Sequence, residues 1–293
     1  MRKQLAFAVS ALAVMGSLTA SIEAADTAKI VLVAGRPSHG PGDHEFNAGC
    51  KLLAKCLAEI PGVEPVVVTG GWPREEKVFE GARTLVFFMD GGGGHPIIKA
   101  DHLETIQKLM DKGVGLVCMH YAVEVPKGNP GDKFLDWIGG YYETGFSTNP
   151  HWTAEIIKLP DHAVTRGVKP FAVRDEWYFN MRFRPEMKGV TSLLSAKPDD
   201  PTRQGVSASP RGPYQHIVDA KGRDEVLAWA VERPDGGRGI GFTGAHAHKN
   251  WGDPNFRKFV LNAILWSAKL DIPPDGVDSK VSDDELKENL DLK

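Results

Sequence analysis

The chain has 293 residues, of which 25% are charged and 42% are hydrophobic, and its formal net charge is −3. This composition is ordinary for a globular protein with one large domain or two small ones. Because the charge is nearly balanced, nothing electrostatic favours a nucleic acid or an anionic membrane as a partner, and we expect neither.

The first 24 residues have the layout of a secretory signal peptide. A short basic start, MRK, precedes an apolar stretch rich in small residues, and SIEA follows it. The apolar part is about fifteen residues long, whereas a membrane-spanning helix needs roughly 20. We therefore expect cleavage after Ala24, a periplasmic or secreted mature protein, and no membrane attachment after cleavage.

The first half of the mature chain alternates apolar strands with helices. Continuous Val/Ile/Leu runs indicate strands at KIVLVAG (29–35), EPVVVTG (64–70), TLVFFMDGGGG (84–94) and VGLVCMHYA (114–122). Amphipathic spacing predicts helices over 45–60 and 101–113. Buried strands separated by single helices indicate an α/β fold with a doubly wound parallel sheet. Ligands of such sheets usually bind beyond the carboxyl ends of the strands.

The second half is less regular. Five segments have the pattern of strands joined by antiparallel turns: HWTAEIIKL, RDEWYFNMRF, TSLLSA, YQHIVDA and EVLAWAVER. GRGIGFTGAHA returns to a buried strand, and residues 253–269 predict a closing helix with Asp253 as its N-cap and Pro254 in its first turn. We expect one domain in which a β-rich insertion lies over the active edge. Residues 271–293 form a C-terminal extension with a short helix from Ser282.

The three cysteines do not predict a disulfide. Cys50 and Cys56 lie on one predicted helix, where a six-residue separation spans about 9 Å. That distance is too long for a bridge. Cys118 lies inside an apolar strand. We expect all three thiols to be buried as small apolar groups.

Histidines follow the carboxyl ends of several predicted strands. The parallel sheet brings these ends to one edge, so residues far apart in the sequence can line one cavity. The histidines expected to do so are His39, His44, His120, His246 and His248.

The pair in GAHAHKNW, residues 244–251, raises a question about orientation. On a regular strand, His246 and His248 would point the same way. If the strand has already turned, we expect only His246, the nearer to the sheet, to enter the site, with Trp251 as a wall of the pocket. The alternative is that both imidazoles bond to loop carbonyls and hold the last strand to its helix.

Two further segments have more than one interpretation. Glu176 beside Trp177 and Tyr178 has the composition of a sugar platform, but it also fits a half-exposed strand.

The glycine run 91–94 has backbone N–H groups that would suit a phosphate. It matches neither the dinucleotide nor the nucleotide loop pattern, so a flexible turn is favoured.

Several blocks resemble the ThuA-like family, named for trehalose utilisation. They are KIVLVAGRPSHGPGDHEFNAGCKLLAKCL, GVGLVCMHYAVE, DHAVTRGVKPFAVRDEWY and GAHAHKNWGDPNFRKFVLNAILWSA. The resemblance covers residues 28–270, which we take as one ThuA-like domain. It implies a flavodoxin-like sheet similar to the class I glutamine amidotransferases. It also implies a role in disaccharide breakdown, with 3-keto-glycosides supplied by a partner sugar dehydrogenase.

One departure from the amidotransferases concerns the nucleophile. Those enzymes carry a cysteine at the sharp turn after the central strand. In GLVCMHYA, Cys118 lies inside the strand and His120 takes the turn. Because apolar burial raises the pKa of a thiol, we expect no glutaminase activity.

The expected chemistry is acid–base catalysis on a small carbohydrate, because a 3-keto-sugar has acidic C–H bonds beside its carbonyl and histidine transfers protons near neutral pH. Isomerase, lyase and hydrolase reactions all remain open, and the alternative is a non-catalytic carbohydrate-binding accessory protein. The residues expected to be catalytic are His120, His246, Glu124 and Glu176. Those expected to bind substrate are His39, His44, Tyr121, His151, Trp177, Tyr178, His248 and Trp251.

The sequence names no cofactor. A divalent metal held by two or three histidines and a carboxylate is one way to stabilise an oxyanion, although no H-E-x-x-H or similar spacing is present. Its ligands would come from His39, His44, His120, His246 and His248.

Overall fold

The computed structural model describes residues 27–205 and 212–293. The expected signal peptide, residues 1–24, lies outside the described residues. In the part of the chain that the structure describes, none of the helices combines the length and the apolar character needed to cross a membrane.

Seven strands form the main sheet, in the spatial order β2-β1-β3-β4-β11-β10-β9. The first five are parallel, and β10 and β9 are antiparallel additions at one edge. This confirms the α/β class expected from the apolar runs. The bounds are β1 (Ala28–Ala34), β2 (Val63–Val68), β3 (Ala82–Phe88), β4 (Gly115–Met119), β9 (Val190–Ala196), β10 (Glu225–Glu232) and β11 (Arg238–Phe242).

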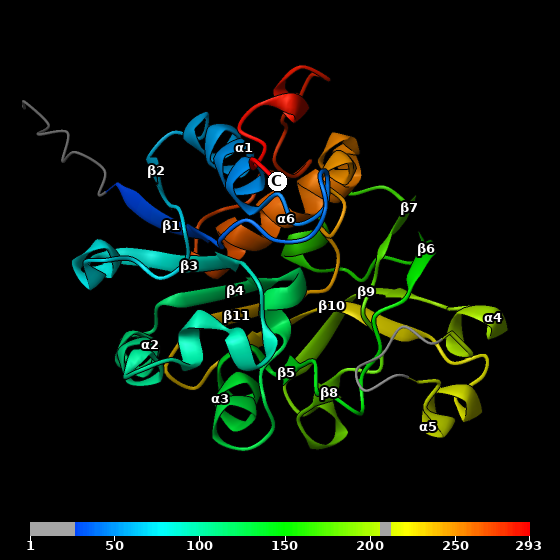
Figure 1. Cartoon of the computed structure of the whole chain (residues 1–293). Helices are drawn as coiled ribbons and strands as arrows, with labels where there is room; N and C mark the ends of the chain where they lie inside the picture. The colour runs from blue at the N-terminus through cyan, green and yellow to red at the C-terminus, as the bar shows by residue number, and fades with distance from the viewer. Residues whose placement is uncertain (1–26, 206–211) are drawn as a thin grey trace, which may run out of the picture.

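Helices cover both faces of this sheet (Figure 1). Alternate residues of β1 enter two separate cores: Ile30 and Leu32 pack on one face, and Val31 and Val33 on the other. Burial on both faces explains why the strand reads as a continuous apolar run. The helices on the first face are α1 (Phe46–Ala58) and α6 (Pro254–Ser267), and those on the second are α2 (His102–Met110) and α3 (Asn129–Ile138).

The start of α6 is as predicted. The carboxylate of Asp253 accepts hydrogen bonds of 2.9 Å from the backbone N–H groups of Asn255 and Phe256, and Pro254 is the first helical residue.

The second half contains both antiparallel strand pairs and short helices. β6 (His151–Ile156) pairs with β7 (Phe171–Glu176), and β5 (Gly140–Tyr141) pairs with β8 (Arg182–Phe183). The strand predicted at YQHIVDA is wrong, because the segment forms the helix α5 (Gln215–Asp219), which follows the helix α4 (Asp200–Arg203). Its one buried residue is Ile217, so the apolar content is too small to distinguish the two conformations.

Short 3-10 turns complete the chain. They are Glu76–Phe79, Gly92–Gly94, Pro96–Ile98, His120–Val123, Ala163–Thr165, Pro185–Met187, His248–Gly252 and Glu285–Lys287. The last is the short helix expected after Ser282, whose hydroxyl accepts a hydrogen bond from Glu285 N–H at 3.3 Å.

Candidate active site

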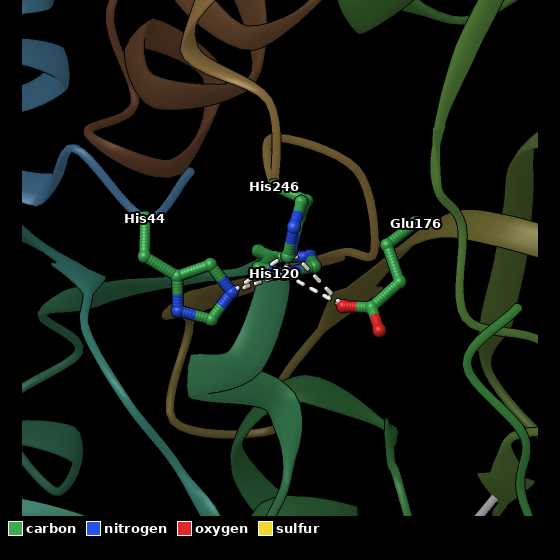
Figure 2. A group of neighbouring side chains, drawn as sticks. All are labelled: His44, His120, Glu176 and His246. Carbon is green, nitrogen blue, oxygen red and sulfur yellow. Dashed lines mark hydrogen bonds and ion pairs between the residues drawn. The ribbon is translucent and has the colours of Figure 1, made fainter. Parts of the chain in front are cut away.

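Four side chains from distant parts of the sequence meet at the carboxyl edge of the sheet (Figure 2). We call His44, His120, Glu176 and His246 the His–Glu cluster. His44 Nε2 lies 3.0 Å from both His120 Nε2 and His246 Nδ1. Glu176 Oε2 lies 3.4 Å from His120 Nε2 and 3.1 Å from His246 Nδ1. These four atoms lie within 4.8 Å of one another, which is the kind of donor set that holds a metal ion.

The elements that carry the cluster explain its assembly. His44 precedes α1, His120 follows β4, His246 follows β11, and Glu176 ends β7. β4 and β11 are adjacent in the sheet, so the residues after them begin side by side. Histidines that follow parallel strands were expected to come together, and His44, His120 and His246 do so.

The backbone is strained at two of the cluster histidines. The φ angle is 49° at His44 and 52° at His120, and Ala245 beside His246 has φ 86°. Residues other than glycine rarely adopt positive φ, and each instance costs on the order of 1–3 kcal/mol. At His120 this conformation turns the chain sharply out of β4 and aims the imidazole at the cluster.

Each imidazole is oriented by an acceptor on its far side. His120 Nδ1 donates to the carbonyl of Thr243 at 3.0 Å. His44 Nδ1 donates to the carboxylate of Asp90, also at 3.0 Å. His246 Nε2 lies 3.5 Å from the carboxylate of Asp43.

Asp175 anchors the loop that carries His246, and the sequence analysis did not select it. Its carboxylate, 2% exposed, accepts hydrogen bonds from the N–H groups of Ala245 at 2.7 Å and Ala247 at 3.0 Å. It also accepts from the N–H of Glu176 at 2.9 Å. One buried carboxylate thus fixes both the end of β7 and the loop after β11. The sequence signal for this residue is its place in RDEW: Asp175 and Glu176 are consecutive in a strand, so their side chains point to opposite faces and one of them points inward.

Burial and charge act in opposite directions inside the cluster. Burial alone would raise the pKa of Glu176, but hydrogen bonds and charge from His120 and His246 outweigh it and lower the pKa. Burial would lower the pKa of His246, but Glu176 outweighs it and raises the pKa. For His44, burial dominates and lowers the pKa to about 3, although Asp90 opposes it.

Glu124 and Tyr121 lie next to the cluster and flank Gly92. A Cβ at Gly92 would lie 3.4 Å from both Glu124 Oε1 and Tyr121 Oη. The Tyr121 ring centroid is 6.0 Å from that of His44. Burial raises the pKa of Glu124 to about 7, even though Thr144 donates a hydrogen bond to it at 2.9 Å. Burial likewise raises the pKa of Tyr121 to about 12, so its hydroxyl stays protonated.

Exposed polar side chains surround the buried cluster. The side chains of His39 and His151 are 43% and 52% exposed, and their rings lie 5.8 Å and 4.8 Å from that of His246. A cavity of about 630 Å³ opens beside them. Its lining includes Asp43, His151, Arg174, Asp175 and His246. This volume is in the usual range for small-ligand sites.

Two residues expected to contact substrate, Trp177 and Trp251, lie in the core instead. Trp177 is fully buried, packs on Phe242 and donates to the Val173 carbonyl. Trp251 is also fully buried and packs on Phe256. His248 begins a 3-10 turn outside the cluster, but it lines the same cavity as His246. The chain leaves the strand at Phe242, and of the two histidines only His246 enters the cluster.

Tyr178 contacts the cluster, whereas Cys118 is buried in the sheet. The hydroxyl of Tyr178 lies 3.3 Å from His120 Nε2, at the floor of the cluster. Cys118 is fully buried within β4, and burial raises the pKa of its thiol far above the usual value. All three cysteines are free.

Solved structures share this fold. A ThuA-like protein from Bacteroides uniformis is 17% identical, with 85% of this chain and 94% of that chain covered at a TM-score of 0.59. A ThuA-like protein from Parabacteroides merdae is also 17% identical, with 88% and 94% covered at a TM-score of 0.54. The mmIFT52 N-terminal domain is 11% identical, with 84% and 99% covered at a TM-score of 0.51.

Among curated proteins, none matches the chain significantly. The family model ThuA, described as trehalose utilisation, matches residues 31–267. This match spans β1 to the end of α6, and it suggests a function related to trehalose utilisation. The chain belongs to the ThuA family.

Proposed function

We propose that this protein is an exported enzyme that acts on a 3-keto-disaccharide or a related glycoside by acid–base chemistry. The observation that carries the proposal is Glu124, whose pKa is raised to about 7 by burial, with the charge of Glu176 in the His–Glu cluster adding to the shift. A carboxyl group with this pKa accepts and returns protons efficiently at neutral pH.

The chemistry follows from the acidity of a C–H bond beside a carbonyl. Glu124 takes the proton from the carbon next to the keto group, and the C–H electron pair forms an enediolate. Groups of the His–Glu cluster stabilise the oxyanion. Return of the proton to a different carbon gives isomerisation. Loss of the substituent at the β-position breaks a C–O bond and releases the second sugar, which takes up a proton.

Membership of the ThuA family supports a disaccharide as the substrate class. The cavity beside His246 is lined in part by Asp43, His151 and Arg174, whose polar groups can bind sugar hydroxyls. A 3-keto-sugar must come from oxidation of a secondary hydroxyl, so a sugar dehydrogenase is the expected functional partner. Residues 1–24 support export, and a mature chain that starts at Ala25 in the periplasm or the medium would verify it.

The direct experiment is incubation of the protein with 3-keto-trehalose and with trehalose in D₂O. Acid–base catalysis predicts incorporation of deuterium at the carbon beside the keto group. Analysis of the products then distinguishes an isomer, an eliminated sugar and a hydrolysis product. His246→Asn is expected to abolish turnover with little change in melting temperature. Cys118→Ala, the matched control from the neighbouring strand, is expected to retain it.

Two outcomes would count against the proposal. If the sugars bind in calorimetry but neither exchange nor turnover occurs, the protein is a carbohydrate-binding accessory protein. If ammonia is released from glutamine and Cys118→Ala abolishes the release, the protein is a glutaminase.

A further inference from the structure

The contact between His44 and His120 needs an explanation. His44 Nδ1 faces a carboxylate and His120 Nδ1 faces a carbonyl, and both partners only accept hydrogen bonds. Both Nδ1 atoms therefore carry the proton, because a neutral imidazole has one N–H. Their Nε2 atoms, 3.0 Å apart, then face each other with lone pairs. Two lone pairs repel unless a cation lies between them.

A shared proton does not satisfy the whole cluster. A proton between His44 and His120 serves one contact, but His246 Nδ1 lies 3.0 Å from the same His44 nitrogen and 3.3 Å from the same His120 nitrogen. Glu176 Oε2 adds a negative charge at 3.1–3.4 Å from two of these nitrogens. Three nitrogens and one carboxylate oxygen thus converge on one point.

The spacing of these atoms is that of ligands around a metal ion. Metal–ligand bonds of about 2.0–2.1 Å place tetrahedral ligands roughly 3.3 Å apart. Five of the six separations within the cluster range from 3.0 to 3.4 Å, and all six are within 4.8 Å. The distant partners of the imidazoles match the outer acceptors that orient metal-binding histidines: Asp90 for His44, Thr243 for His120 and Asp43 for His246.

We propose that the His–Glu cluster binds one divalent first-row transition-metal ion through His44 Nε2, His120 Nε2, His246 Nδ1 and Glu176 Oε2. Imidazole nitrogens suit Zn²⁺, Fe²⁺, Co²⁺ and Ni²⁺, and the carboxylate admits Mn²⁺. Ca²⁺ and Mg²⁺ are disfavoured because they prefer oxygen ligands.

With an ion bound, the ligand residues and Glu124 have different roles. Ligand histidines are not free to carry protons, so the cluster polarises the keto oxygen while Glu124 moves the proton. This last step rests on the proposed function, but the metal site itself does not, because binding requires no sugar.

The test is metal binding by the full mature chain after treatment with a chelator. Zn²⁺, Mn²⁺ and Co²⁺ are titrated separately by calorimetry, and bound metal is counted by elemental analysis. We expect one ion per chain, a rise in melting temperature on loading, and visible absorption bands with Co²⁺.

Substitutions identify the ligands. We choose His44→Asn because asparagine tolerates the positive φ angle at this position. Glu176→Gln keeps the side-chain shape. Both are expected to weaken binding by at least 100-fold, and Asp90→Asn, which touches no metal, by 10- to 100-fold through the orientation of His44. His216→Asn, at an exposed histidine outside the cluster, should bind like the unchanged chain.

The outcomes separate the two proposals. No binding of any of the three ions at millimolar concentration, or binding that Glu176→Gln leaves unchanged while the variant stays folded, would overturn the metal site. Metal binding without turnover of a keto-sugar would overturn the proposed function alone. Full turnover by metal-free protein would overturn the metal's role alone.

Discussion

Glu124 shows how one partly buried carboxyl group links stability to activity. It is partly buried, and burial raises its pKa from 4.5 to about 7. The folded protein therefore holds this proton more tightly than the unfolded chain does between pH 4.5 and 7. As the pH rises through this window, the folded state loses stability relative to the unfolded state.

Substitution Glu124→Gln removes this titration while keeping a polar group of similar shape. We expect stability equal to the unchanged chain at pH 4 and greater at pH 8, by up to about 3 kcal/mol for a shift of this size. Turnover of a keto-sugar should fall by about 10²–10⁴-fold, the usual contribution of a general base. Urea unfolding at both pH values and a pH–rate profile measure the two effects. Equal stability differences at pH 4 and pH 8 would contradict the pKa assignment.

For individual residues, the sequence predicts the positions of the polar side chains at the site better than those of the aromatic side chains. His44, His120 and His246 follow strands, and the parallel sheet brings them together. Trp177 and Trp251 also follow strand segments, yet both are buried in the core. The side on which an aromatic ring lies depends on where the strand ends. β7 ends at Glu176, which has no glycine or proline beside it. β11 ends at Phe242, and the glycine beside it, Gly241, lies inside the strand and does not mark its end.

At the scale of elements, long apolar runs and long amphipathic runs were predictable, and short helices were not. The strands β1, β3 and β4 and the helices α1 and α6 have enough buried residues to show their periodicity. Helix α3 was not predicted because NPGD at its start is typical of a turn. Its helical state depends on Phe134, Trp137 and Ile138, which pack on the sheet, and tertiary contacts of this kind are not local in the sequence.

The C-terminal segment stabilises the loop that carries His44. Glu45, 1% exposed, accepts hydrogen bonds from the N–H groups of Gly42 at 2.9 Å and Asp291 at 2.7 Å, and Lys293 Nζ lies 3.3 Å away. Burial opposes the charge on Glu45, but these hydrogen bonds outweigh it and lower the pKa. The stability this carboxylate provides is therefore present above pH 4.5 and is lost as the pH falls through its lowered pKa.

Substitution Glu45→Gln is expected to cost about 1–3 kcal/mol at pH 7, because it weakens hydrogen bonds to a buried charge. The cost should shrink below pH 4.5. Hydrogen exchange at the N–H groups of Gly42 and Asp291 should accelerate, and Glu288→Gln, at an exposed position, should change neither quantity. A Glu45→Gln variant with unchanged exchange at Asp291 would show that the segment is held by other contacts.

At the scale of the whole molecule, the order of the strands decides how the chain folds. β11 lies between β4 and β10, although it comes near the end of the sequence. The parallel half of the sheet and its antiparallel edge are therefore joined through β11, and neither half is complete before this strand is in place. Long-range pairing of this kind predicts cooperative unfolding of the sheet as one unit.

Gly241 in β11 offers a test of this cooperativity. A Cβ at this position would lie 2.1 Å from the ring of Trp229 in β10, so Gly241→Ala forces the two strands apart. Overpacking typically costs about 1–3 kcal/mol, and each kcal/mol lowers the melting temperature by roughly 2–4 °C at this size.

We expect tryptophan fluorescence and far-UV circular dichroism to show a single transition in the unchanged chain, shifted down equally for both signals in Gly241→Ala. Gly40→Ala, where a Cβ meets no atom within 4 Å, should not shift it. If the two signals separated in Gly241→Ala, with the antiparallel edge unfolding first, β9 and β10 would be an independent unit. The sheet would then not depend on β11 as its topology requires.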